Sequence, residues 1–119
     1  MAGSWRFDVK PLFKPLSGTG FAWFSISDRL ARKATFSGSM IDASKIGDGI
    51  EDVESALQFL RNHAAEFHVD RDRIVLIGES FGAQLASTAA IRGASVKAVV
   101  AFYCPSDLLA FAVPPRNLP

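Results

Sequence analysis

The clearest pattern along the chain is a helical one that begins near residue 50. Apolar residues from Ile50 to Phe67 recur at steps of three and four, which places them on one face of a helix. Acidic side chains gather where this helix would begin, a position that the helix dipole favours for negative charge. They are Asp48, Glu51, Asp52 and Glu54. The spacing therefore predicts an amphipathic helix over Ile50–Phe67.

Two apolar runs further along the chain predict buried strands. Ile74–Ile77 is apolar on both faces, as expected for a central strand of a parallel sheet, and Val96–Tyr103 has a similar character. The segment between them, Phe81–Ile91, is rich in small residues and is predicted to be a helix that ends at Gly93.

The first part of the chain gives weaker signals. Phe21–Ser27 is a short, aromatic-rich apolar run that follows Ser17-Gly18-Thr19-Gly20, and it is predicted as the first strand. Asp28–Gly49 is polar and contains several glycines, so it is predicted mainly as a connecting loop with a helical turn at most.

The order of these elements predicts the fold class. Strands and helices alternate in the sense that produces a parallel sheet with helices on its faces. We therefore predict an α/β fold with a central parallel sheet and flanking helices, in a single domain over residues 1–119. With 49% hydrophobic residues, ten of them Phe, the composition excludes a disordered chain.

Charge and composition also exclude several kinds of partner. The net charge is +1 and the 13 Lys and Arg are spread along the chain, so nucleic acid has no basic patch to bind. No apolar run approaches the ~20 residues that span a bilayer and no signal-peptide core is visible, so we expect no membrane contact and a cytoplasmic location. Cys104 is the one cysteine, and without a CxxC motif we expect no metal and no cofactor.

The candidate chemistry lies where the strand Ile74–Ile77 meets the following helix. The run Gly78-Glu79-Ser80-Phe81-Gly82 fits G-x-S-x-G, in which a serine nucleophile occupies a sharp turn from strand to helix. In so tight a turn the residues two before and two after the serine are expected to collide unless both are glycine. The turn would expose the Ser80 hydroxyl and direct the Phe81 N–H at the oxyanion formed on attack. The alternative is a chance junction in which Ser80 only caps the helix; Glu79 receives no role in either case.

Residues 50 to 109 resemble the bacterial carboxylesterases of the α/β-hydrolase superfamily, of the hormone-sensitive-lipase and feruloyl-esterase-like type. The similarity is carried by IEDVESALQFL, by IVLIGESFGAQLAS and by VKAVVAFYCPSDLL. It implies a serine-dependent carboxylic ester hydrolase with Ser80 as nucleophile, acting on a small or medium ester. Upstream, the Arg-Leu-Ala run that begins at Arg29 matches the family's Tyr-Arg-Leu-Ala-Pro motif, whereas Asp28 and Arg32 replace its tyrosine and proline.

The N-terminus is similar to another part of that family. Met1-Ala2-Gly3-Ser4-Trp5 aligns with a His-Gly-Gly-x-Trp oxyanion loop, with Met1 in place of the histidine. The resemblance implies that the backbone N–H groups of Gly3 and Ser4 complete the oxyanion hole begun by Phe81. The alternative is an ordinary chain terminus without a role.

The rest of a catalytic triad is not found after the serine. In this fold the chain order is Ser, then Asp or Glu, then His, but His63 and His68 both precede Ser80. They are expected at the opposite end of the strand, roughly 15 Å from Ser80, where proton transfer over ~3 Å is excluded. We predict that both are solvated, with His68 near the carbonyl groups that end the helix. Asp107 shares a sheet edge with Ser80 but is interpreted mainly as a helix N-cap.

The sequence therefore predicts the middle part of a carboxylesterase, truncated so that its catalytic Asp and His are missing. Activity of this chain alone is expected to be marginal. The alternative is a non-catalytic binding or interaction protein that self-associates through exposed sheet edges. A nucleotide-binding function is excluded, because Gly18 and Gly20 lack the third glycine of G-x-G-x-x-G and no G-K-[S/T] loop is present. Cys104 is interpreted as a small buried hydrophobe.

Overall fold

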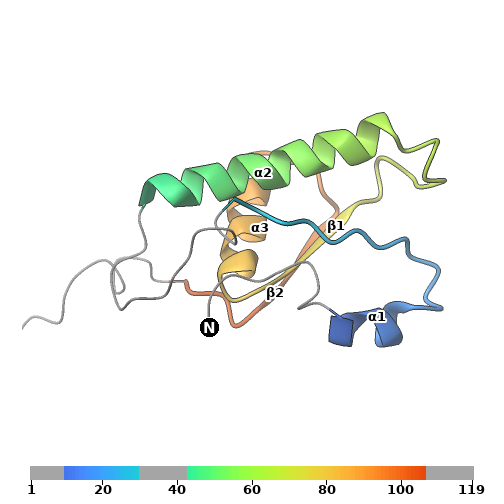
Figure 1. Ribbon diagram of the computed structural model, residues 1–119, viewed down its shortest axis with the longest axis horizontal. Helices are drawn as coiled ribbons and strands as arrows, with labels where there is room; N and C mark the ends of the chain where they lie inside the picture. Colours follow the sequence, from blue (N-terminus) through green and yellow to red (C-terminus); the bar gives the residue numbers. More distant parts are fainter. Residues whose placement is uncertain (1–9, 30–42, 107–119) are drawn as a thin grey trace, which may run out of the picture.

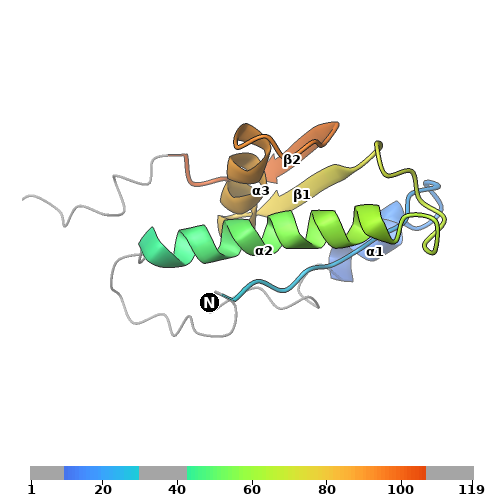
Figure 2. The same ribbon diagram turned by 90° about the horizontal axis from the view of Figure 1, so that it is seen from above.

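Two parallel strands joined by a helix form the centre of the protein. The computed structural model describes residues 10–29 and 43–106, with the elements α1 (Lys10–Leu16), α2 (Ala43–Asn62), β1 (Val75–Glu79), α3 (Phe81–Ile91) and β2 (Ala98–Phe102). The strands pair in register from Val75 opposite Ala98 to Glu79 opposite Phe102. α3 contacts both strands and also α2 (Figures 1 and 2). The predicted α/β arrangement, a parallel sheet with flanking helices, is confirmed.

The core lies where α2 meets α3. Five apolar side chains from the two helices, each at most 5% exposed, form one cluster: Ile50, Val53, Leu57, Leu85 and Ala89. Ile74 and Leu76 pack against this cluster from the side of β1. The α2 members are spaced by three and four residues, so the periodicity of the sequence did identify the face that is buried.

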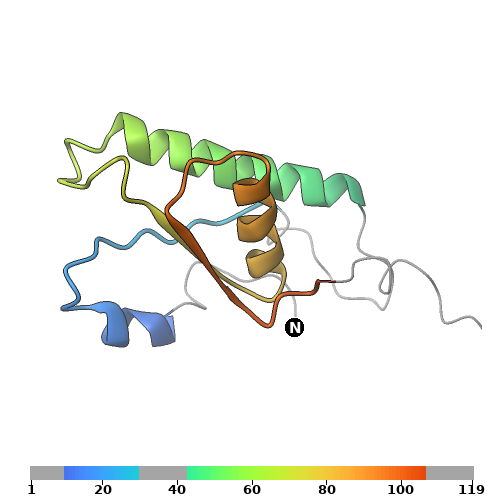
Figure 3. The ribbon, with the colours of Figure 1, turned by 180° about the vertical axis from the view of Figure 1, so that it is seen from behind.

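The opposite face of the sheet is largely uncovered in the described part of the chain. Because side chains alternate along a strand, Val75 and Ile77 of β1 share a face with Val100 and Phe102 of β2. These four side chains are 36–43% exposed. Figure 3 shows β2 in front of β1, as the edge strand of the pair, with none of the described helices in front of it. Parallel sheets are normally covered on both faces, so this apolar face has the character of a buried one.

The longest helix differs from its prediction at both ends. α2 begins at Ala43 and ends at Asn62, so residues 43–49, predicted as loop, are helical. No acidic residue lies in its first turn, and the expected interaction of the acidic group with the helix dipole is wrong. Asp48, Glu51 and Asp52 instead contact Arg29. The fourth acidic residue of the group, Glu54, pairs with Arg92.

The predicted strand Phe21–Ser27 is also wrong. Its backbone forms no strand ladder, and it runs as an irregular segment beside α2 (Figure 1). A strand requires a neighbouring backbone to bond with, whereas residues 20–26 line a cavity whose other wall is formed by residues 73–79. The apolar side chains are therefore used for packing without strand pairing. α1, which contains Pro15, was not predicted.

Candidate active site

A single residue, Ser80, separates β1 from α3. Its backbone has φ 50° and ψ −119°, a conformation that L-residues rarely adopt. Such a conformation costs of order 1–3 kcal/mol and persists only where the surrounding structure imposes it. Here the Ser80 N–H donates to the Phe102 carbonyl at 3.0 Å, while the Ser80 carbonyl accepts from the Ala83 and Gln84 N–H groups. Both sides of the turn are therefore held by backbone hydrogen bonds.

The two glycines of the motif do not have equal roles. A Cβ on Gly78 would lie 2.4 Å from the Gly82 carbonyl oxygen and 2.6 Å from the Ala83 nitrogen, so no larger residue fits there. A Cβ on Gly82 would meet no atom within 4 Å. The prediction that both positions exclude a side chain is thus correct for Gly78 and wrong for Gly82. The backbone of residue 82 occupies the space in which a side chain at position 78 would lie. A side chain at position 82 itself would point into open space.

The side chain of Ser80 is not used to cap α3. Ser80 precedes the helix but makes no side-chain capping hydrogen bond, and the residue is exposed. The alternative in which Ser80 serves only as a cap is therefore wrong. A serine held in a strained conformation, with its hydroxyl uncommitted to the helix, is available to react with a ligand.

The Phe81 N–H lies at the start of α3, where it has no preceding turn to bond with. Within the described residues it donates to no backbone carbonyl. A free N–H at a helix N-terminus is a suitable donor for a developing negative charge. Gly3 and Ser4, the other two residues predicted for an oxyanion hole, lie outside the described residues.

Glu79 has a partner that the sequence analysis missed. The Tyr103 hydroxyl donates a hydrogen bond of 2.7 Å to the Glu79 Oε2. This bond, together with desolvation and the negative charge of Glu79, raises the pKa of the Tyr103 phenol. The sequence carries no signal for this contact, because it depends on the register in which β1 and β2 pair.

The histidines lie away from the turn. His63 follows α2, and its Nδ1 is 2.8 Å from the Phe59 carbonyl oxygen, with its ring 4.2 Å from that of Phe59. His68 is exposed and has φ 53° in the turn that leads toward β1. His63 is partly exposed and makes the contact with helix carbonyls that was expected of His68. Both precede the amino end of β1, whereas Ser80 follows its carboxyl end (Figure 1).

The remaining candidates are placed as follows. Cys104 is half-buried, with its Sγ 3.5 Å from the Gln84 Oε1, so it is more than a small hydrophobe. Asp107 lies outside the described residues. In the described ranges no group of three or more His, Cys, Asp or Glu side chains could hold a metal ion.

Arg29 attaches the irregular segment at residues 21–28 to α2. Its backbone N–H and its Nε donate to the Asp52 carboxylate at 2.7 and 2.9 Å, and its Nη2 donates to Glu51 at 3.1 Å. The hydrogen bonds to Asp52 and then to Glu51 raise the pKa of the guanidinium. Arg29 is the arginine that matched the family's Tyr-Arg-Leu-Ala-Pro motif. Its contacts fix the end of the segment against the middle of α2.

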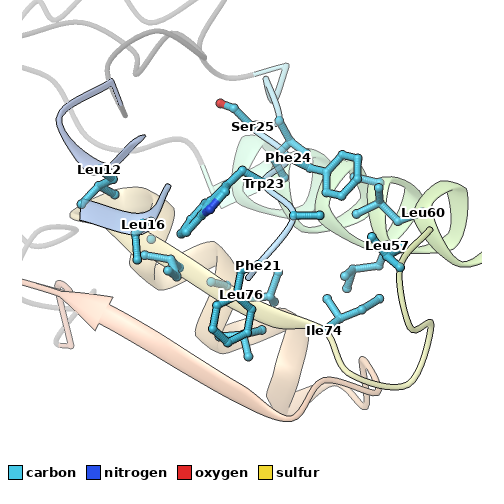
Figure 4. A pocket seen from close by; sticks show the side chains of 18 of the residues that line it. Leu12, Leu16, Phe21, Trp23, Phe24, Ser25, Leu57, Leu60, Ile74 and Leu76 are labelled. Atoms are coloured by element: carbon cyan, nitrogen blue, oxygen red, sulfur yellow. The ribbon is translucent and has the colours of Figure 1, made fainter. Parts of the chain in front are cut away.

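A cavity of about 690 Å³ lies between this segment and β1. Side chains from α1, the segment, α2 and β1 surround it (Figure 4). Its wall includes Gly78, Glu79 and Gly82 but neither Ser80 nor Phe81. The turn residue Ser80 therefore does not line this apolar cavity, although residues on both sides of it do. Among helices in the described ranges, none has the length and apolar character needed to cross a bilayer.

The sequence profile of the BD-FAE family, bifunctional feruloyl and acetyl-xylan esterases of the α/β-hydrolase type, matches residues 6–116. A probable isoprenylcysteine alpha-carbonyl methylesterase of Arabidopsis thaliana is 45% identical over 42 residues, which are 35% of this chain and 9% of the relative. The chain thus matches only about a tenth of that relative's length. No solved structure gave a significant match. A family match over nearly the whole chain, on a parallel α/β unit, shows that this protein belongs to the BD-FAE family of esterases.

Proposed function

We propose that the chain carries the nucleophile of a carboxylic ester hydrolase and that this nucleophile is Ser80. The observation that supports this most strongly is the strained, uncapped Ser80 between β1 and α3. A serine that only ended a strand or began a helix would not need a left-handed φ. Membership of an esterase family supports the same reaction class.

In the proposed reaction the Ser80 Oγ attacks the carbonyl carbon of an ester while a base accepts the hydroxyl proton. The tetrahedral oxyanion forms beside the Phe81 N–H, the alcohol leaves with a proton, and an acyl-serine remains. Water then attacks the acyl carbon, releases the carboxylic acid and returns the proton to Ser80. Gly78 contributes by allowing the backbone of α3 to approach the strand and so hold the turn.

We propose that the base comes from outside the described residues. His63 is bonded to the Phe59 carbonyl and His68 precedes β1, so neither lies at the turn. Gly3 and Ser4 stay as proposed further donors to the oxyanion. For substrate we propose an ester with a small or medium acyl group, which membership of an esterase family supports only as a reaction class. The Arabidopsis relative is named a methylesterase, a name that describes the alcohol part of its ester as methyl.

A fluorophosphonate probe tests the proposal directly. Because the chain lacks a positioned base, labelling should be slow, and it is followed over a long incubation at high probe concentration. Ser80 should then form a covalent adduct, located by peptide mass spectrometry, and Ser80→Ala should remove it. Ser106→Ala is the matched control, since Ser106 is also an exposed serine but lies outside the turn. An adduct on another serine, or equal labelling of Ser80→Ala, would contradict the assignment.

Hydrolysis of a short activated ester gives the second measurement. Without a positioned base, which contributes roughly 10²–10⁴-fold, turnover by the 119-residue chain should be slow. A fast turnover rate that rises with pH through a pKa near ~6.5, and that is lost in Ser80→Ala, would show that a histidine base reaches Ser80. The proposed absence of a base among the described residues would then be wrong.

The second candidate is a non-catalytic interaction protein. The uncovered face formed by Val75, Ile77, Val100 and Phe102 supports self-association through this sheet. This candidate predicts a concentration-dependent mass in analytical ultracentrifugation together with no labelling of Ser80. The esterase proposal predicts labelling whatever the mass.

A further inference from the structure

The end of β2 contacts the turn around Ser80 at three successive positions. The Phe102 carbonyl accepts from the Ser80 N–H at 3.0 Å, and the Tyr103 hydroxyl donates to Glu79 at 2.7 Å. The Cys104 Sγ lies 3.5 Å from the Gln84 Oε1. Glu79 and Ser80 are the last residue of β1 and the turn residue itself, and Gln84 lies in the first turn of α3.

The contact between Tyr103 and Glu79 differs from the other two in the strength of its hydrogen bond and in the backbone conformation of Tyr103. A hydrogen bond from a neutral hydroxyl to a carboxylate is stronger than one between neutral groups. Tyr103 itself has φ 38°, so the residue that follows β2 also takes a positive φ, as does Ser80, which follows β1. A residue held in that conformation needs surrounding contacts to keep it there, and the bond to Glu79 is one of them.

This contact has a geometric consequence for Ser80. Glu79 precedes Ser80 in the chain, and Phe102, which bonds the Ser80 N–H, precedes Tyr103. The Tyr103–Glu79 bond therefore closes a second link between the same two backbone segments. With both links formed, the ends of β1 and β2 cannot separate without breaking a charged hydrogen bond as well as a backbone one.

We propose that Tyr103 is a positioning residue for Ser80, acting through the hydrogen bond of its hydroxyl to Glu79. The inference deepens the proposed function, since it concerns the same serine, and it rests on that function for its catalytic meaning. Tyr103 does not contact the reacting atoms. Its role is to keep the Ser80 N–H on the Phe102 carbonyl and so to keep the Ser80 backbone in its strained conformation.

The contact itself can be observed because Tyr103 is the one tyrosine in the chain. Incorporation of tyrosine labelled with ¹³C at Cζ gives a single resonance that responds to the partner of the hydroxyl. At neutral pH this resonance should move in Glu79→Gln and in Glu79→Ala. An unchanged resonance in both variants would overturn the proposal.

The positioning role can be tested by measuring the hydrogen-exchange rate of the Ser80 backbone N–H. This measurement does not depend on catalytic activity. In Tyr103→Phe the Ser80 N–H should exchange roughly 3- to 10-fold faster, the range for loss of one exposed charged hydrogen bond. The Lys97 N–H, which donates to the Ile74 carbonyl at the other end of the strand pair, is the internal reference and should keep its rate. Thr19→Val removes an exposed, hydrogen-bonded hydroxyl elsewhere and is the control variant. An unchanged Ser80 rate, or an equal increase at Lys97, overturns the proposal.

Fluorophosphonate labelling connects the positioning to the chemistry. Tyr103→Phe and Glu79→Ala should label roughly 3- to 10-fold more slowly than the native chain, whereas Glu79→Gln should label at a near-native rate because its amide oxygen still accepts from Tyr103. Equal rates in all variants would overturn the proposal. A native chain that is not labelled, but whose Ser80 exchange depends on Tyr103, would refute the nucleophile and support the positioning. Failure of the proposed nucleophile can therefore be distinguished from failure of the proposed positioning role.

Discussion

Substitution of Gly78 by alanine is the sharpest test of the turn. The added methyl would lie 2.4 Å from the Gly82 oxygen, 2.5 Å from the Gly82 carbonyl carbon and 2.6 Å from the Ala83 nitrogen. All three are backbone atoms at the start of α3, so no side-chain rotation can relieve the overlap. Inserting a methyl into packed space typically costs 1–3 kcal/mol, and we expect roughly 3 kcal/mol or more here because the helix itself must move.

Gly82→Ala provides a matched control in the same motif. Its methyl meets open space, and alanine is about 1 kcal/mol better than glycine inside a helix. Urea unfolding followed by circular dichroism should give a midpoint about 1 to 3 M lower for Gly78→Ala and an equal or higher one for Gly82→Ala. If Gly78→Ala lacks the native circular dichroism spectrum while Gly82→Ala keeps it, the same conclusion follows more strongly. Equal midpoints for the two variants would refute the close approach of α3 to β1.

Three other predictions concern the core, the surface and the alkaline range. Leu85→Ala should lower the free energy of unfolding by roughly 2–5 kcal/mol, whereas Ile91→Ala, at 86% exposure, should change it by less than about 0.5 kcal/mol; similar losses would contradict the assigned core. Arg29→Gln should cost at most about 1 kcal/mol at low salt and almost nothing at about 0.5 M NaCl, and a salt-independent loss would argue against the ion pairs with Glu51 and Asp52. The hydrogen bond from Tyr103 to Glu79 raises the phenol pKa, so the stability it contributes is complete below the ordinary tyrosine value and is lost as pH rises through the raised one. The urea midpoint of the native chain should therefore fall more steeply above about pH 10 than that of Tyr103→Phe, and parallel curves would contradict it.

Elements determined by local pattern were predictable from the sequence. α3 has the predicted bounds, and Gly93 adopts φ 99° after its end, as a C-terminal glycine should. The strand pair was expected because Ile74–Ile77 and Val96–Tyr103 are apolar on both faces, although β2 is shorter than its run. The position of Ser80 between a strand and a helix followed from the same local pattern, while its role as nucleophile stays a prediction.

Features that depend on a distant partner were not predictable. Phe21–Ser27 has the composition of a strand, but composition cannot supply the neighbouring backbone that a ladder needs. The acidic side chains of α2 were assigned to a helix end because their partner, Arg29, is about twenty residues away in the sequence. Tyr103 was missed at the candidate site for the same reason, since its relation to Glu79 exists only in the register of the two strands.

The indole of Trp23 gives the cavity beside β1 an unexpected property. Among the described side chains, its Nε1 is buried without any hydrogen-bond acceptor. Leaving such a donor unpaired costs about 1–3 kcal/mol, which the surrounding apolar contacts have to offset. Replacing Trp23 by phenylalanine would keep an aromatic ring in the wall and remove the donor. Position 23 is thus a natural starting point for engineering a more robust form of the chain, in a cavity wall that does not include Ser80.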